Sequence, residues 1–121
     1  MAVTEQLNEI LQGLRAAIPE LSGALIASTD GLAIATSVAG GDSNRMAAMV
    51  ATALSLGKRI TDTFGGGGLK ETSVVGEQGQ IYIYSAGSKG VLAVIAASEA
   101  NVGLIHIESR DAAARIAHLL G

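Results

Sequence analysis

Residues 21–38, LSGALIASTDGLAIATSV, contain two short apolar runs separated by Asp30-Gly31. The runs cover residues 21–29 and 32–38 and are rich in Ala, Ile, Leu and Val. Asp-Gly between two apolar runs is a strong signal for a β-hairpin, because a tight type I′ turn requires positive φ at both central residues. We therefore expect an antiparallel hairpin with positive φ at Asp30 and at Gly31.

The two ends of the chain are expected to be helical. In residues 4–18 apolar side chains recur every three or four positions, which predicts a helix with one apolar face that Pro19 ends. Near the other end, Asn101 can accept hydrogen bonds from the first amides of a helix that ends at Leu120.

A third helix is expected in the middle of the chain, over residues 44–64. Gly40 and Gly41 end the hairpin, and the carboxylate of Asp42 or the hydroxyl of Ser43 can cap the helix that follows. Four successive glycines at residues 65–68 then end this helix.

Three further strands are expected over residues 69–77, 80–86 and 91–97, with glycine-containing turns between them. The last of these runs is continuously apolar, which is typical of a strand in the middle of a sheet. The element order is then α-β-β-α-β-β-β-α. Since short hairpin connections imply antiparallel pairing, we expect an α+β fold with a five-stranded antiparallel sheet covered by helices. The length fits a single domain, residues 1–121.

The composition excludes several classes of function. Eight Lys and Arg residues are scattered among eleven acids, which leaves a net charge of −3. Nucleic-acid binding depends on basic residues that neutralise phosphates, so this role is not expected. The chain has no cysteine, so disulfides, thiolate chemistry and cysteine-based metal sites are excluded. We find no signal-peptide pattern and no apolar run long enough to insert into a membrane, and we expect a cytoplasmic protein.

The middle helix suggests an interaction surface. On a helical wheel its larger apolar side chains share one half, which we expect to pack on the sheet; they are Met46, Met49, Val50, Ala53, Leu54, Leu56, Gly57, Ile60 and Phe64. The opposite half contains Ala48, Ala51, Thr52, Ser55 and Thr63, together with Arg45, Lys58, Arg59 and Asp62. Small residues there favour close contact with another protein. The alternative is an exposed face that is rich in alanine because alanine favours helices.

The strand over residues 69–77 suggests a second contact. Because it follows the glycine run, we expect it at an edge of the sheet, and Thr72, Ser73 and Val74 leave it without charge or proline. Unprotected edges pair with other edges, and pairing about a two-fold axis would join two sheets. The alternative is a strand paired on both sides. The predicted dimer or partner interface consists of Arg45, Ala48, Ala51, Thr52, Ser55, Arg59, Asp62, Thr72, Ser73 and Val74.

Catalytic and ligand-binding patterns are absent from the sequence. His106 and His118 are twelve residues apart, whereas two ligands on one helical face are three or four apart. The glycine run at residues 65–68 precedes a strand, and Leu69 separates it from Lys70, so it does not match a phosphate-binding loop. We therefore expect no catalytic residues, no cofactor and no metal, and the chain is not expected to be an enzyme.

The chain resembles the Roadblock/dynein-light-chain family, in particular its bacterial MglB-like members. The likeness covers nearly the whole chain, and the Asp-Gly-Leu hairpin that follows a Pro-x-x-x-Gly helix end is its most specific part. The residues that carry it are 18–24 (IPELSGA), 28–32 (STDGL), the alanine-rich segment 46–56, 76–80 (GEQGQ), 85–87 (SAG), 92–95 (LAVI) and 101–104 (NVGL).

This resemblance implies a Roadblock/profilin-like fold, with one helix on one face of the sheet and two on the other. It also implies a homodimer formed through the middle helix and the third strand. Bacterial members are similar to regulators of small Ras-like GTPases, and some activate hydrolysis without an arginine finger. A GTPase bound across the paired helices would contact positions such as Arg45, Ala48, Thr52, Ser55 and Arg59.

Three functions remain open at this point. The first is a dimeric regulator or docking platform for a small bacterial GTPase. The second is a structural scaffold in a motility, transport or signalling complex, either as a homodimer or paired with a paralogue. The third is a small-molecule sensor that uses a pocket between the sheet and a helix.

Overall fold

The computed structural model describes residues 2–38 and 42–121, and its elements follow the expected order. Gly40 and Gly41, which were expected to end the hairpin, lie outside the described residues. The elements are α1 (Val3–Ala17), β1 (Leu21–Ser28), β2 (Ala33–Thr36), α2 (Ser43–Thr63), β3 (Glu71–Val75), β4 (Gly79–Ala86), β5 (Gly90–Ala97) and α3 (Val102–Leu120).

The five strands form one antiparallel sheet in the order β2-β1-β5-β4-β3. The predicted α+β fold is therefore confirmed. The continuously apolar strand β5 is central, as expected, because it is covered on both faces. Strand β3 pairs only with β4 among the described strands and forms one edge of the sheet, as predicted from its position after the glycine run.

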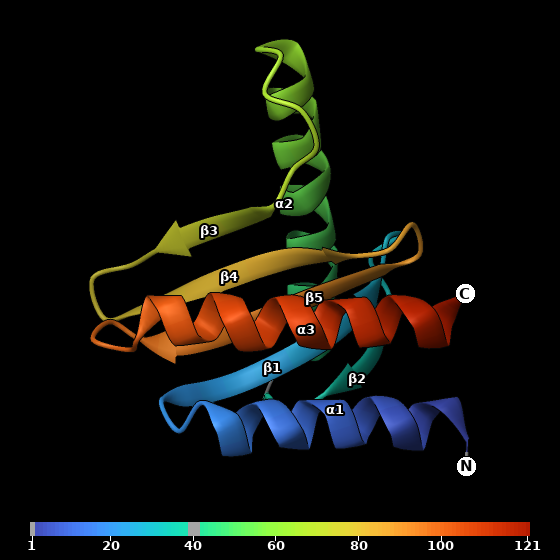
Figure 1. Cartoon of the computed structure of the whole chain (residues 1–121), viewed down its shortest axis with the longest axis vertical. Helices are drawn as coiled ribbons and strands as arrows, with labels where there is room; N and C mark the ends of the chain where they lie inside the picture. The colour runs from blue at the N-terminus through green and yellow to red at the C-terminus, as the bar shows by residue number, and fades with distance from the viewer. Residues whose placement is uncertain (1, 39–41) are drawn as a thin grey trace.

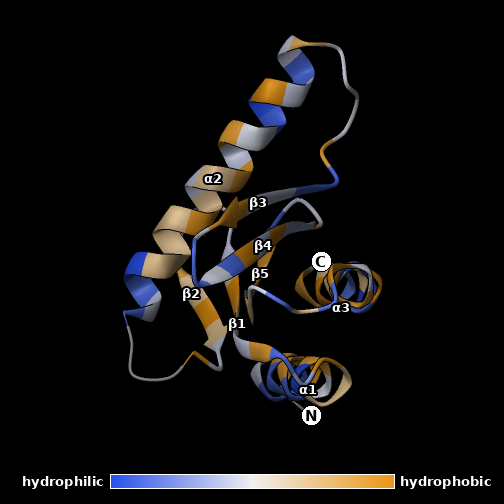
Figure 2. Ribbon diagram, turned by 90° about the vertical axis from the view of Figure 1, so that its left-hand side faces the viewer, coloured by the Kyte–Doolittle hydropathy of each residue, from blue (hydrophilic) through white to orange (hydrophobic). Residues whose placement is uncertain are grey.

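The helices cover the sheet in two layers. Figure 2 shows α1 and α3 on one face and α2 on the other. Alternate residues of β5 point to opposite faces, so Leu92 and Val94 pack under α1 and α3 while Val91 and Ala93 pack under α2. This alternation explains why the central strand has no polar side chain.

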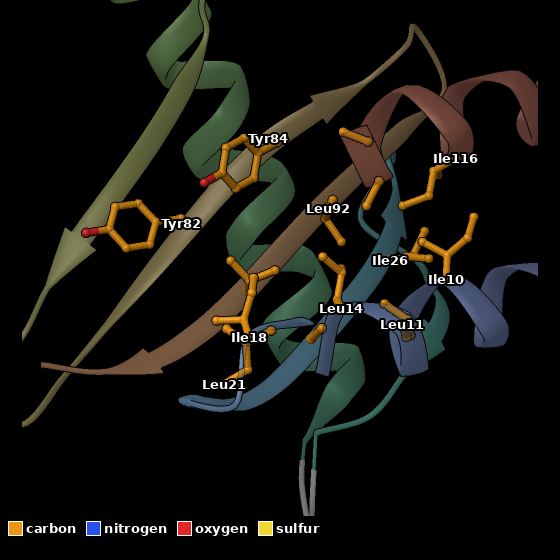
Figure 3. Close-up of a cluster of buried hydrophobic side chains, with 14 of the residues drawn as sticks. Ile10, Leu11, Leu14, Ile18, Leu21, Ile26, Tyr82, Tyr84, Leu92 and Ile116 are labelled. Carbon is orange, nitrogen blue, oxygen red and sulfur yellow. The ribbon is translucent and has the colours of Figure 1, made fainter. Parts of the chain in front are cut away.

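The core on the α1/α3 side is the larger of the two. Helix α1 contributes Leu7, Ile10, Leu11 and Leu14, whose spacing places them on one face. Figure 3 shows side chains of α1 and α3 meeting those of the strands in this core, with Tyr82 and Tyr84 at its β3 side. Helix α1 ends at Ala17, two residues before Pro19, as the sequence predicts.

The hairpin turn between β1 and β2 differs from the predicted one. Gly31 has a φ of 91°, but within the described chain no residue other than glycine has positive φ, and Asp30 is therefore not in a type I′ turn. The Gly31 amide donates to the Ser28 carbonyl (3.0 Å), and the Ser28 amide donates to the Leu32 carbonyl (2.8 Å). This pattern is that of a three-residue loop with glycine in the left-handed position. The hairpin was predicted correctly and its turn type was wrong.

The caps of two helices can be compared with their predictions. The Asn101 side chain accepts a hydrogen bond from the Leu104 amide (3.0 Å), which confirms it as the cap of α3. Asp42 occupies the cap position of α2 but its side chain makes no capping hydrogen bond. Its carboxylate lies instead 3.9 Å from the Arg45 guanidinium, in the first turn of the helix.

Helix α2 is longer than the sheet is wide. It has 21 residues, or about 31 Å at ~1.5 Å per residue, whereas five strands span only about 19 Å at ~4.8 Å spacing. It crosses β3 at Gly57, where a Cβ atom would lie 2.4 Å from the Thr72 hydroxyl. Beyond this point the end of α2 projects past the edge of the sheet, as Figure 1 shows.

Candidate protein-interaction surface

The face of α2 that packs on the sheet is rotated from the predicted one. The helix buries Ala47, Val50, Ala51, Leu54 and Gly57. Ala51, which was predicted on the outward face, is only 7% exposed and packs in the core on the α2 side, so that prediction is wrong. Conversely, Met49, Leu56, Ile60 and Phe64 were expected to face the sheet and are exposed.

These exposed side chains, together with the partly buried Ala53, form a continuous apolar line, which we call the α2 stripe. Its members are Met49, Ala53, Leu56, Ile60 and Phe64. They are spaced by four, three, four and four residues, which keeps them on one side of the helix and is close to the spacing of a coiled-coil seam. Phe64, at the end of the helix, is 69% exposed. An apolar line of this length outside the core indicates a protein contact.

An apolar groove lies beside the first half of the stripe, between α2 and the ends of β3, β4 and β5. We call it the apolar groove, and its volume is about 390 Å³. It is lined by Met46, Met49, Val50, Ala53, Val74, Gly76, Gly79, Gln80, Ile81, Ile83 and Ile95. Among these, Gln80 has the one polar side chain, and it bonds on the other face of the sheet, to the Tyr82 hydroxyl (2.9 Å) and the Ala97 carbonyl (3.1 Å).

The edge strand β3 continues this apolar surface. Ser73, Val74 and Val75 are exposed, whereas Thr72 is partly buried where α2 crosses it. Val74 lies opposite Ile81 of β4 and faces the α2 side. The structure therefore places two predicted interface residues, Ser73 and Val74, at an open edge next to the groove.

A second depression lies on the opposite flank of α2, against the β1–β2 turn. We call it the hairpin hollow; it has a volume of about 410 Å³ and is lined by Thr29, Asp30, Gly31, Ala48, Ala51, Thr52, Ser55, Leu56 and Arg59. It brings together four exposed residues of the predicted interface, namely Ala48, Thr52, Ser55 and Arg59. The turn comes close because Gly31 lies against Ala48, where an added Cβ would be 3.3 Å from the Ala48 Cα.

The remaining predicted interface residues lie outside both depressions. Arg45 is exposed and pairs weakly with Asp42 at 3.9 Å, and an exposed pair of this kind contributes little to stability. Asp62 is exposed at the far end of α2, where it lines a shallow hollow with Lys58 and the glycine run.

The α2 stripe was missed because the helical wheel assigns the largest apolar residues to the core. The spacing of Met49, Leu56 and Ile60 was visible in the sequence. So was the length of the helix, which exceeds what five strands can cover. A comparison of the two lengths would have indicated that part of the apolar half remains exposed.

Some buried polar groups on the α1/α3 side have hydrogen-bond partners, whereas the buried Ser109 hydroxyl of α3 has none among the described residues. The Tyr84 hydroxyl lies 2.7 Å from Nδ1 of His106, and the Arg110 guanidinium donates to the Glu71 carboxylate (2.7 Å), which links α3 to β3. Burial raises the pKa of Tyr84 to about 12. In the described part of the chain, no group of three or more potential metal ligands is found. Across residues 2–38 and 42–121, no helix has the length and apolar character needed to cross a membrane.

Comparison with known proteins identifies relatives of the chain. A family model described as the Roadblock/LC7 domain matches residues 7–96. An uncharacterized protein of Methanocaldococcus jannaschii is 33% identical over 97 residues, which are 79% of this chain and 81% of that protein.

Solved structures share the fold over almost the full length. A Roadblock/LC7 domain from Streptomyces avermitilis superimposes with a TM-score of 0.84 at 28% identity, covering 93% of this chain and 95% of that domain. The gliding protein MglB from Thermus thermophilus superimposes with a TM-score of 0.86 at 19% identity, covering 98% of this chain and 91% of that protein.

Proposed function

Because the chain belongs to the Roadblock/LC7 family, whose members are small regulatory or adaptor proteins, we propose that it is a dimeric regulator of a small Ras-like GTPase. In this proposal it has no catalytic residues of its own and works in the cytoplasm. It serves either as an activator of hydrolysis or as a docking platform. The observation that carries the proposal is the α2 surface, which has an apolar stripe along one flank and a polar hollow along the other, with Leu56 bordering both.

The two flanks suit two different partners. The α2 stripe, the apolar groove and the open β3 edge are uncharged, and a second copy of the chain can cover them by symmetric pairing. The hairpin hollow has hydroxyls and the charges of Asp30 and Arg59. Mixed polar surfaces of this kind are typical of contacts that form and dissociate, as a regulator and its GTPase must do.

Activation in this proposal does not need a catalytic side chain. Arg59 is exposed at the hairpin hollow, and in this proposal it contacts the GTPase outside the phosphate site. Acceleration would then come from holding the switch segments of the GTPase in the geometry that positions its own water-orienting residue. This agrees with the resemblance to family members that act without an arginine finger.

The other two functions have weaker support. A scaffold would use the same surfaces, and it differs only in that its partner is not a GTPase. A small-molecule sensor would use the apolar groove, but the lining residues there offer no set of converging polar groups to orient a ligand.

Two variants separate the two proposed contacts. Ile60→Asp places a charge in the middle of the α2 stripe and is expected to convert the dimer into a monomer, as measured by light scattering. Ser55→Arg fills the hairpin hollow and is expected to keep the dimer while it lowers GTPase affinity at least ~10-fold, the effect of losing about 1.4 kcal/mol. Both side chains are exposed, so neither change should prevent folding.

The GTPase to test is a small Ras-like protein encoded next to the gene, loaded with GTP, with binding and hydrolysis as readouts. If the wild type neither binds it nor alters its hydrolysis, the GTPase proposal fails and the scaffold remains. If the wild type is monomeric, the dimer fails regardless of the GTPase result.

A further inference from the structure

Phe64 has an unusual position for an aromatic side chain. The chain has only three aromatic residues, and the two tyrosines are buried in the core. Phe64 is 69% exposed at the end of the projecting helix. Its ring lies over Gly66, where an added Cβ would be 2.3 Å from a ring carbon, so the glycine leaves room for the ring. A large exposed aromatic side chain of this kind is typical of an interface anchor.

The projecting part of α2 has the length needed to reach a neighbouring sheet. Seven residues follow Gly57 up to Phe64, which is about 10 Å at ~1.5 Å per residue. If a second sheet is joined at β3, its first two strands lie at ~4.8 and ~9.6 Å. Phe64 would then lie above the second of them, which is β4 of the second copy. The β4 side chains that face α2, Ile81 and Ile83, line the apolar groove.

Antiparallel pairing of two β3 strands would also place α2 of one copy beside the apolar groove of the second copy. Two copies of β3 related by a two-fold axis run antiparallel, and directly opposite residues then point to the same face. Thr72 faces α2, so its opposite residue in the second copy must also face α2, and within β3 this is either Thr72 or Val74. If Thr72 lay opposite Thr72, the two α2 helices would cross the strands at the same position and overlap, so Val74 lies opposite Thr72. Val74 lines the groove. The helix that crosses at Thr72 therefore lies along the groove of the other copy.

We infer that Phe64 of one copy inserts into the apolar groove of a second copy, and that this contact fixes the register of two antiparallel α2 helices. The inference rests on the dimer proposed above and adds its anchor residue and its register. Met49, at the rim of the groove, is opposite Phe64 of the second copy. Four residues toward the C-terminus from Met49 on one helix, and four toward the N-terminus from Phe64 on the other, Ala53 is opposite Ile60. Because Phe64 and the apolar groove are on the same chain, each copy of a homodimer can insert its Phe64 into the groove of the other.

Disulfide trapping tests this register, since the chain has no cysteine of its own. The double variant Ala53→Cys/Ile60→Cys keeps Phe64 and is expected to form a covalent dimer on mild oxidation. Within one chain the two positions are about 10 Å apart at ~1.5 Å per residue, beyond the ~7 Å limit for a disulfide. Each single variant is a control. It can form a covalent dimer only if the same position of the two helices, 53 opposite 53 or 60 opposite 60, lies in contact.

The outcomes separate the register from the dimer itself. A cross-linked double variant with unlinked single variants supports the inference. A double variant that is a dimer by light scattering but does not cross-link overturns the register and leaves the proposed dimer intact. Cross-linking of Ala53→Cys alone also overturns it. A wild type that is monomeric overturns the register and the dimer together.

Truncation of the anchor gives an independent test. Burying one phenylalanine strengthens association by about tenfold or more, and the dimer contains two, so Phe64→Ala should raise the dimer Kd by ~100-fold. Ile107→Ala is the matched control, because Ile107 is 68% exposed but lies on α3, on the other face of the sheet. An equal effect of both substitutions, or no effect of Phe64→Ala, would overturn the anchor role.

Discussion

Gly57 and Gly13 both lie inside helices, but their surroundings are opposite. An added Cβ at Gly57 would be 2.4 Å from the Thr72 hydroxyl, whereas at Gly13 it would meet nothing within 4 Å. Gly13→Ala should raise the free energy of unfolding by about 0.5–1 kcal/mol through helix propensity. Gly57→Ala should lower it by ~1 kcal/mol or more, because overpacking at the β3 crossing exceeds that gain. Urea unfolding of the two variants measures both free energies of unfolding. Equal stabilisation by Gly13→Ala and Gly57→Ala would contradict the close crossing of α2 and β3.

Tyr84 should make stability depend on alkaline pH. Burial raises its pKa from 10.0 to about 12 in the folded chain. The unfolded chain therefore loses the phenolic proton first, and the stability associated with Tyr84 is complete below pH 10 and falls between pH 10 and pH 12. Tyr84→Phe should flatten this decline in unfolding titrations, and phenolate absorbance gives the ionisation directly. A wild-type decline that persists unchanged in the variant would exclude Tyr84 as its source.

At the scale of elements, the strands were easier to predict than the exposed face of α2. Period-two alternation in β4 and the glycine turns are local signals, and they placed all five strands in the observed order along the chain. Which side of α2 is buried depends on how far the sheet extends beneath it, and a helical wheel contains no such information. Small residues such as Ala47 and Ala51 pack against the sheet because they allow close approach, while larger ones remain outside.

The two halves of α2 should differ in hydrogen exchange. Residues 43–57 lie over the sheet, whereas residues 58–63 project beyond it and are exposed apart from Thr61. At low protein concentration the amides of the projecting half should exchange faster, because little packing opposes local opening. At high concentration the proposed dimer should protect that half selectively. Uniform protection along α2 at all concentrations would contradict this division.

At the scale of the whole molecule, the fold followed from the order of elements together with antiparallel connections. The candidate interaction surface followed only in part. The sequence identified α2 and the β3 edge, and the hairpin hollow contains four exposed residues of the predicted interface. The groove could not be predicted, because it combines residues from one helix and three strands whose spacing is set only after folding.

Salt should distinguish the two proposed contacts of the molecule. The α2 stripe and apolar groove are uncharged, so the dimer Kd should change less than about twofold with sodium chloride, since screening acts on charges. Sodium sulfate should strengthen the dimer. Binding at the hairpin hollow, where Asp30 and Arg59 lie, should weaken as sodium chloride rises. Sedimentation and titration calorimetry measure the two constants, and a dimer that dissociates in sodium chloride would contradict an apolar interface.

The layer arrangement also determines how this molecule can be attached to something else. Helix α1 begins and helix α3 ends in the layer that faces away from α2 (Figure 2). A fluorophore, a surface tether or a fused protein joined at either terminus would therefore leave the stripe, the groove and the hollow uncovered. Immobilised through its α1/α3 side, the chain would present its α2 side outward, ready for capture experiments.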